Sequence, residues 1–214
     1  MASTAGLIRG FYGIVNVTEG GPDPVHAAVA MLRGGCRCIQ LRAKNVDPAL
    51  RLRLALFLRV MTRTGGVLLI IDDDAGTALE ADADGVQVGQ DDLSCKEARR
   101  VVGPDRLVGV STHNIYQLEK AMADGADYAG FGPVFSTGTK ENPDPVTGLD
   151  GLAGAVALTS IPLVAIGGIT TGNAREVVGT GVHAFASIGA VYSAPDMAAA
   201  VSGFSELFGK TGEM

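Results

Sequence analysis

Short apolar runs alternate along the chain with longer stretches in which apolar residues recur at helical spacing. The apolar runs predict eight β-strands. Their expected ranges are Phe11–Val17, Cys38–Leu41, Val67–Ile71, Gly85–Val88, Leu107–Ser111, Tyr128–Phe131, Pro162–Ile166 and Ala184–Ile188. The intervening stretches predict helices at Val25–Leu32, Pro48–Met61, Ala75–Ala81, Lys96–Val102, Ile115–Ala123, Leu149–Leu158 and Pro195–Phe208. This alternation indicates a parallel sheet whose successive strands are connected by helices.

Strand–helix units repeated in this way over 214 residues favour one α/β domain, residues 1–214, folded as a (β/α)8 TIM barrel. The strands read as apolar runs, as expected of strands that are buried on both faces. Glycine-containing turns at Gly34-Gly35, Gly85, Gly125 and Gly181 separate a helix from the next strand. Glycine suits that position because it adopts a positive φ at little cost. An open doubly wound sheet is the alternative fold.

Charge and cysteine content narrow the class of protein. The chain has 17 basic and 23 acidic residues, a net charge of −6, so nothing supports a basic surface for nucleic acid. It contains neither a secretory signal pattern nor an apolar run long enough to span a membrane. The three cysteines, Cys36, Cys38 and Cys95, fit neither a disulfide framework nor a zinc site, and we expect Cys36 and Cys38 to be small buried residues. A cytoplasmic protein is the simplest interpretation, and the oligomeric state stays open, a homo-oligomer included.

Polar residues that directly follow the predicted strands are informative, because barrel enzymes place their chemistry at the carboxyl ends of the strands. Gln40, Arg42 and Lys44 fall on one face of the second strand by the period of two. We expect the two cations and the amide to point into one space. The alternative is an ordinary salt-bridged strand end.

Acidic clusters follow the third and fourth strands, at Asp72-Asp73-Asp74 and Asp91-Asp92. Neighbouring carboxylates repel each other unless a hard cation binds them, and Mg²⁺ takes one or two carboxylates together with phosphate oxygens. The alternative role is capping of a helix N-terminus. We expect Asp74 to cap a helix, and Asp73 and Asp92 to hold Mg²⁺.

The fifth and sixth strands lead into further polar segments. Ser111 could hydrogen-bond a heterocycle, Asn114 could cap a helix, and His113 lacks an evident nucleophile and orienting acid. His26 and His183 are expected to be structural. After the sixth strand a long loop carries Thr137, Thr139 and Lys140, which suggest an anion site.

Glycines follow the last two strands, at Gly167-Gly168 and at Gly189 after Ile188. Barrels commonly bind phosphate through backbone N–H groups at these positions. Tight turns without a ligand are the alternative interpretation.

In this order the motifs resemble those of the thiamine phosphate synthase family, over nearly the whole chain. The matching segments are Tyr12-Gly13-Ile14-Val15, Gln40-Leu41-Arg42-Ala43-Lys44, Gly89-Gln90-Asp91-Asp92, Gly109-Val110-Ser111-Thr112-His113, Pro133, Thr137-Gly138-Thr139-Lys140, Ala165-Ile166-Gly167-Gly168-Ile169 and Ala186 to Val191. The resemblance implies a transferase that joins hydroxymethylpyrimidine diphosphate to thiazole phosphate, with loss of pyrophosphate and with Mg²⁺ as cofactor.

The resemblance also implies a role for each site residue. Asp73 and Asp92 would hold Mg²⁺, and Asp72 would lie beside the diphosphate. The diphosphate would be bound by Arg42, Lys44 and Lys140, the pyrimidine by Gln40 and Ser111, and the thiazole phosphate by Thr137, Thr139, Gly168, Ile188 and Gly189. Catalysis would rest on Arg42, Ser111 and Lys140, without a protein nucleophile.

Three positions depart from the family pattern. Asp72 stands where Asn is usual, Gln87 where His is common, and Gly189 where Ser is usual. We expect the charge of Asp72 to be neutralised by Mg²⁺ or by a cation such as Arg42 or Lys44. The alternative functions are a thiazole tautomerase-like isomerase and a non-catalytic protein that binds thiazole phosphate.

Overall fold

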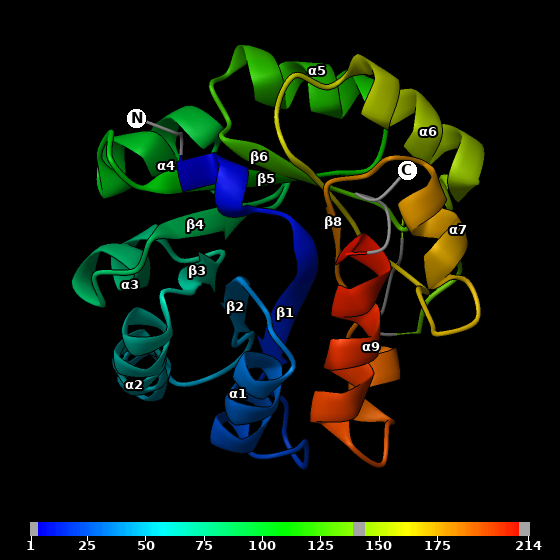
Figure 1. The fold of residues 1–214 in the computed structure, drawn as a ribbon. Helices are drawn as coiled ribbons and strands as arrows, with labels where there is room; N and C mark the ends of the chain where they lie inside the picture. Colours follow the sequence, from blue (N-terminus) through cyan, green and yellow to red (C-terminus); the bar gives the residue numbers. More distant parts are fainter. Residues whose placement is uncertain (1–3, 139–143, 210–214) are drawn as a thin grey trace.

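Eight parallel strands form a closed ring, and helices surround it (Figure 1). The computed structural model describes residues 4–138 and 144–209. Each strand pairs with the next in sequence, and β1 (Gly10–Asn16) closes the ring with β8 (Ala184–Phe185) through the pairs Gly10↔Ala184 and Phe11↔Phe185. The predicted (β/α)8 barrel is therefore confirmed, and the open-sheet alternative is wrong.

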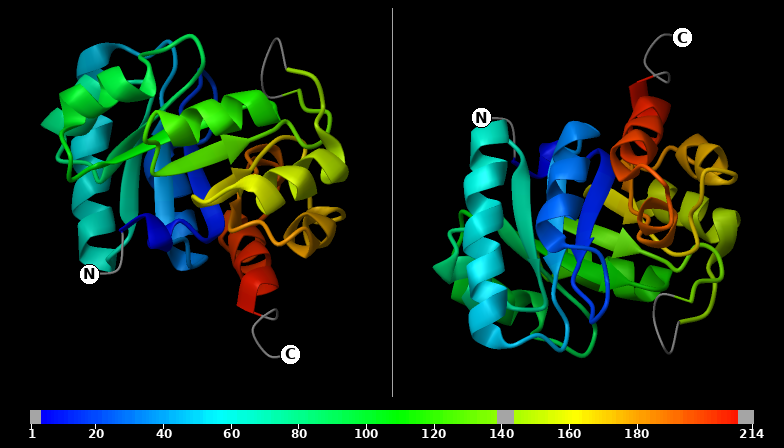
Figure 2. Two further views of the ribbon diagram at one scale, coloured as in Figure 1. Left: turned by 90° about the horizontal axis from the view of Figure 1, so that it is seen from above. Right: turned by 90° about the horizontal axis from the view of Figure 1, so that it is seen from below.

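The remaining strands are β2 (Cys38–Arg42), β3 (Leu68–Asp72), β4 (Gly85–Val88), β5 (Leu107–Thr112), β6 (Tyr128–Phe131) and β7 (Leu163–Ala165). The helices are η1 (Thr4–Leu7), α1 (Pro24–Arg33), α2 (Pro48–Gly65), α3 (Ala75–Glu80), α4 (Cys95–Val102), α5 (Ile115–Ala123), α6 (Gly148–Leu158), α7 (Ala174–Gly179), α8 (Gly189–Tyr192) and α9 (Met197–Gly209). Perpendicular views show the strands enclosed by these helices (Figure 2). None of the described helices is long and apolar enough to cross a membrane.

The element predictions differ from the structure mainly near the C-terminus. The sequence did not predict α7 or α8, and the predicted eighth strand, Ala184–Ile188, is too long. The Ala186 N–H still donates to the Ala165 carbonyl at 2.8 Å, but the next residue turns away and its Ser187 hydroxyl donates to the Ile169 carbonyl at 2.6 Å. Ile188 then becomes the N-cap of α8.

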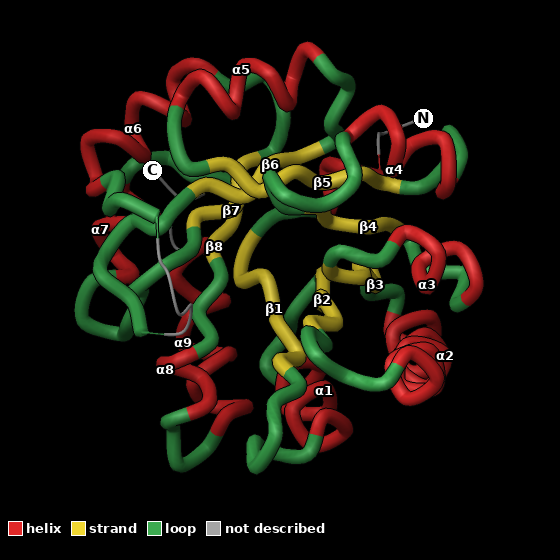
Figure 3. Tube along the Cα trace, turned by 180° about the vertical axis from the view of Figure 1, so that it is seen from behind, coloured by secondary structure: helices red, strands yellow, loops and turns green. Residues whose placement is uncertain are grey.

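Alternation along the strands separates two apolar cores, one between the strands and the helices and one inside the ring of strands, whose course Figure 3 traces. Outward-facing strand residues pack against the helices, and they include Phe11, Ile39, Leu69, Val86, Val108, Ala129 and Phe185. Inward-facing residues fill the barrel lumen, together with two residues near η1, and this set includes Ala5, Ile8, Tyr12, Ile14, Cys38, Leu68, Ile70, Leu107, Tyr128, Val164 and Ala184. Because the lumen is filled in this way, the polar inward-facing residues other than the two tyrosines lie toward the carboxyl ends of the strands.

Side-chain caps stand at the starts of helices, and glycines stand in the turns that precede strands. Asp23, Asp47, Asp74, Ser94 and Asn114 cap α1 to α5 with side-chain oxygens that accept backbone N–H bonds, which confirms the expected caps Asp74 and Asn114. Three of the predicted turn glycines, Gly35, Gly125 and Gly181, have positive φ.

Gly109 is an inward-facing glycine of β5 that makes room for the Tyr128 ring. A Cβ at Gly109 would lie 2.2 Å from Tyr128 Cζ. Tyr128 is fully buried, so its ring cannot move into solvent. The lumen packing therefore depends on the missing side chain.

We predict that Gly109→Ala lowers the free energy of unfolding by about 1–3 kcal/mol, the usual cost of overfilling a packed core. The matched control is Gly154→Ala, because Gly154 is exposed in α6 and a Cβ there meets nothing within 4 Å. That control should stabilise by about 0.5–1 kcal/mol, since alanine favours the helix. Urea denaturation measures both changes, and equal stabilities of the two variants would contradict the packing argument.

Candidate active site

The residues expected to form the site converge at the carboxyl ends of β2 to β5. Gln40 and Arg42 face inward on β2, Asp72 ends β3, and Ser111 faces inward on β5. Closure of the ring brings these ends to one rim, as the sequence predicts. The site is therefore built by the barrel and by the short segments that follow each strand.

Arg42 is held at the rim by two neighbouring strands. Its Nη1 donates to Asn16 Oδ1 at 2.7 Å, and its Nε lies 3.7 Å from Asp72 Oδ2. Asn16 is itself buried at the end of β1, and its N–H donates to the Tyr192 hydroxyl of α8 at 2.8 Å. The guanidinium is thus oriented before any anion binds.

Asp72 lies in an environment that disfavours its charge. Burial and the neighbouring Asp73 carboxylate raise the pKa of Asp72 to about 7, although Lys44 and Arg42 act in the opposite direction. The expected pairing with Arg42 is present but long. Protonation is a further route to neutrality that the sequence analysis did not consider.

Asp73 and Asp92 bring two carboxyl groups together beside a cation. Asp73 Oδ2 lies 2.8 Å from Lys44 Nζ, and Asp92 is within hydrogen-bonding range of the Asp73 carboxyl. Asp92 Oδ2 also accepts the Gly89 N–H at 2.7 Å. Burial and the contact with Asp73 raise the pKa of Asp92, which is the signature of two acids that repel each other.

This pair fits a magnesium ion that completes its shell with substrate oxygens and water. Among the described residues no group of three or more His, Cys, Asp and Glu side chains is gathered as a metal cage. Two carboxylates with an open side are the donor set that Mg²⁺ takes when it also binds phosphate. The Asp73–Asp92 contact is the observation that favours this assignment.

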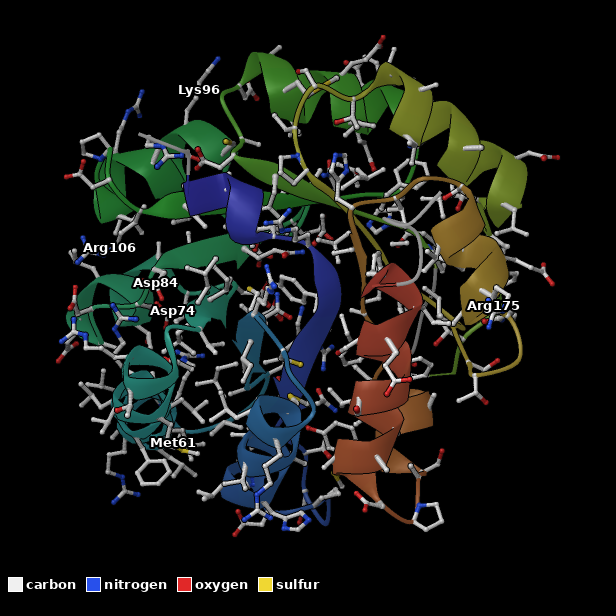
Figure 4. All side chains as sticks on the ribbon, in the orientation of Figure 1. Met61, Asp74, Asp84, Lys96, Arg106 and Arg175 are labelled. Carbon is white, nitrogen blue, oxygen red and sulfur yellow. The ribbon has the colours of Figure 1, made fainter. Side chains whose placement is uncertain are left out.

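Asp74 belongs to the outer layer and not to the site. Its side chain accepts the N–H and the hydroxyl of Thr77 at 2.9 Å and 2.7 Å, and Arg51 Nη2 lies 2.7 Å from it. Burial works against ionisation of Asp74, but the bonds from Thr77 and the charge of Arg51 outweigh it and lower its pKa. Figure 4 shows Asp74 between α2 and α3, in agreement with a capping role.

Ser111 and Gln40 present polar groups at the top of the lumen. The Ser111 hydroxyl accepts from Gln87 Nε2 at 3.0 Å, and the Ser111 carbonyl accepts from Gln90 Nε2 at 2.6 Å. Gln40 is 4% exposed, and its amide has no hydrogen-bond partner within residues 4–138 and 144–209. An unpaired amide in this position is available to a ligand.

His113 joins the end of β5 to the segment after β6. Its Nδ1 lies 2.6 Å from the Gly132 carbonyl, and its Nε2 lies 3.4 Å from Asp144 Oδ2. No orienting acid for His113 is evident from the sequence, but in the structure Asp144 stands beside its ring. His183 is structural as expected, because its Nδ1 accepts the Leu163 N–H at 3.2 Å.

The loop after β6 packs directly on the glycines after β7. Phe135 N–H donates to the Gly167 carbonyl at 3.0 Å, and a Cβ at Gly168 would lie 2.4 Å from the Ser136 carbonyl. Gly167 and Gly168 both have positive φ, which disfavours a side chain in addition to the lack of space. The segment is therefore a tight turn, as the alternative interpretation expects, and whether it also binds phosphate stays a prediction.

The expected thiazole phosphate residues gather in neighbouring loops. Thr137 follows the segment that touches Gly168, and Ile188 and Gly189 begin α8, next to the β7 loop through the Ser187–Ile169 bond. A Cβ at Gly189 meets nothing within 4 Å, so this departure removes a hydroxyl and not a clash. Thr139 and Lys140 lie outside the described residues.

Sequence reasoning missed two residues that position others. Asn16 orients Arg42, and Gln87, which was noted only as a departure, contacts Ser111. Both face inward at strand ends. The period-two rule that selected Gln40 and Arg42 could have identified Asn16 and Gln87 as inward-facing, but not the residues that they contact.

Comparisons with known proteins agree with this arrangement. A family model described as thiamine monophosphate synthase matches residues 11–191. A thiamine-phosphate synthase from Chloroflexus aurantiacus is 44% identical over 190 residues, 88% of each chain, and one from Moorella thermoacetica is 37% identical over 197 residues, 92% of this chain and 94% of the relative.

A solved structure is similar over nearly its full length. The thiamine phosphate pyrophosphorylase from Pyrococcus furiosus superposes with a TM-score of 0.88 at 34% identity, covering 97% of this chain and 98% of that one. The sequence match and the shared barrel point to the same family as the motifs at the strand ends. The chain belongs to the thiamine monophosphate synthase family.

Proposed function

We propose that this protein joins hydroxymethylpyrimidine diphosphate to thiazole phosphate and releases pyrophosphate and thiamine phosphate. The observation that carries the proposal is the Asp73–Asp92 carboxyl pair at the mouth of a barrel of this family, with Lys44 against Asp73 and Arg42 against the adjacent Asp72. Cations and paired acids together suit a diphosphate that arrives with a divalent cation. The protein is a transferase that needs no covalent intermediate.

The diphosphate side of the site provides the driving electrostatics. Arg42, already oriented by Asn16, and Lys44 would neutralise the charge that builds up on the departing pyrophosphate. The carbon–oxygen bond to the diphosphate breaks, positive charge develops on the pyrimidine methylene carbon, and the thiazole nitrogen forms the new carbon–nitrogen bond. Lys140 would add a third cation, as the family pattern implies.

Mg²⁺ held by Asp73 and Asp92 would supply further stabilisation of the leaving group's charge. Gln40 and Ser111 would bind and orient the pyrimidine from the lumen side. Thr137, Gly168, Ile188 and Gly189, with Thr139, would hold the phosphate of the thiazole half. The two halves would thus meet across the open end of the barrel.

The three thiols are free and buried, in keeping with a reducing compartment, and we place the enzyme in the cytoplasm. Small molecules are its partners in the reaction. A homo-oligomer stays compatible with this function.

The reaction itself is the first test. Incubated with both halves and Mg²⁺, the wild-type protein should form thiamine phosphate and pyrophosphate in equal amounts, as followed by chromatography. At limiting Mg²⁺, Asp92→Asn should lose roughly 100-fold in turnover, because removing one group that stabilises developing charge typically costs that much. The matched control is Asp91→Asn, an exposed neighbour, which should keep its turnover. No product from the wild type would refute the proposed reaction, and equal loss in both variants would refute the metal-binding role of Asp92.

Asp72 generates a separate prediction about pH. Its folded pKa of about 7 exceeds the reference value of 3.8, so the folded state holds a proton that the unfolded state releases. Stability should therefore fall as pH rises from about 4 to about 7.

Asp72→Asn should remove that loss, which is at most about 4 kcal/mol at about 1.4 kcal/mol per tenfold change in proton affinity. Denaturation in EDTA at pH 4 and pH 8 measures the difference between variant and wild type. Asp74→Asn is the contrast, because the lowered pKa of Asp74 gives stability that is present at neutral pH and lost on acidification. A constant difference between Asp72→Asn and wild type across this range would show that Asp72 is ionised throughout.

A further inference from the structure

A chain of buried hydrogen bonds runs through the lumen and ends at Ser111. The Tyr12 and Tyr128 hydroxyls lie 3.1 Å apart, and the Tyr128 hydroxyl donates to Gln87 Oε1 at 2.9 Å. Gln87 Nε2 then donates to Ser111 Oγ at 3.0 Å. The series connects the bottom of the polar region to the residue proposed to contact the pyrimidine.

The surrounding strands leave space for this chain. Gly109 makes room for the Tyr128 ring, and a Cβ at Gly130 would lie 3.0 Å from Gln87 Nε2. Both glycines occupy inward-facing positions on β5 and β6. The Gln87 amide is therefore held in one place by its neighbours and by its hydrogen bonds with Tyr128 and Ser111.

The hydrogen bonds of this series also have a preferred donor-to-acceptor direction. Tyr12 is fully buried, and apart from Tyr128 and a long 3.4 Å contact with Gln87, its hydroxyl meets the Cys38 thiol. If the donor and the acceptor of every bond were exchanged, the Tyr12 hydroxyl would have to donate to the Cys38 sulfur, which is a weak acceptor. With Tyr12 donating to Tyr128, each buried hydroxyl proton has an oxygen acceptor, and buried polar groups without partners are costly.

In that direction the Gln87 amide donates to Ser111. The Ser111 proton then cannot point into the lumen, and within the described part of the chain it has no acceptor. We propose that Gln87 is a positioning residue that turns the Ser111 hydroxyl proton toward the substrate, where it meets an acceptor such as a pyrimidine ring nitrogen. This inference rests on the proposed function and adds a residue to it. The tyrosine pair acts one step further back, by fixing the orientation of the amide.

Gln87→Met keeps the length of the side chain and removes the hydrogen bonds to Tyr128 and Ser111. It should raise KM for hydroxymethylpyrimidine diphosphate about tenfold, near the upper end of what one hydrogen bond contributes to binding, and leave KM for thiazole phosphate within about twofold. Tyr128→Phe, which frees the amide to rotate, should give a smaller rise in the same KM. Thermal melting of each variant shows whether it folds, and Tyr128→Phe provides the test if Gln87→Met does not.

A double-mutant cycle with Ser111→Ala separates positioning from a general structural role. If Gln87 acts through the serine hydroxyl, Gln87→Met should have no further effect on the pyrimidine KM once Ser111 is alanine. A pyridine analogue that lacks the acceptor nitrogen should bind the wild type about tenfold more weakly than the pyrimidine does. The analogue and the pyrimidine should bind Gln87→Met with equal affinity. An undiminished Gln87→Met effect in the alanine background, or equal rises in both KM values, would overturn the inference.

Failure of the proposed function is recognised separately, because wild-type protein would then form no thiamine phosphate. The cycle is in that event measured with equilibrium dissociation constants for hydroxymethylpyrimidine diphosphate. Loss of affinity in Gln87→Met that disappears in the Ser111→Ala background supports positioning, and absence of such coupling refutes it.

Discussion

Closure of the strand ring by the β1–β8 pairing is the constraint on which the rest of the structure depends. Once eight parallel strands close, all of their carboxyl ends meet at one rim, and the side chains that face inward share a small volume. Apolar residues and two tyrosines fill the lower part of that volume. Polar groups from β2 to β5 are left to gather at the rim, and the site is the consequence of this sorting.

The rim concentrates charges of both signs that would repel or lose solvation in isolation. Asp72 illustrates the cost, because burial next to Asp73 raises its pKa to about 7. Asp73 and Asp92 reduce the same cost through Lys44 and, in the proposed function, through Mg²⁺. Arg42 is oriented by a hydrogen bond to Asn16, and its ion pair with Asp72 is long, so it compensates that carboxylate only in part. The electrostatic cost of this rim falls most when an anion and a divalent cation bind together, because each compensates charges that are already there.

The sequence predicted the barrel because apolar strand runs alternate with helical segments, and it predicted part of the rim from the period of two at the strand ends. Gln40, Arg42 and Ser111 lie where that rule puts them, whereas Asp73 and Asp92 lie in the segments that follow β3 and β4. The rule fails after β7, where positive φ values at Gly167 and Gly168 and the Ser187–Ile169 bond replace strand geometry and lead into α7 and α8. Partners such as Asn16 for Arg42 and Asp144 for His113 depend on distances between strands and loops far apart in sequence, which a pattern along one chain does not contain.

The central claim is that Asp73 and Asp92 form one half of a cation site whose other half is the diphosphate of the substrate. Isothermal titration of Mg²⁺ into the protein, with and without pyrophosphate, tests it most directly, because coupling between two ligands is reciprocal. The account predicts that pyrophosphate tightens Mg²⁺ binding at least about tenfold in the wild type and does not do so in Asp92→Asn. Mg²⁺ binding that is equally tight with and without pyrophosphate would contradict it.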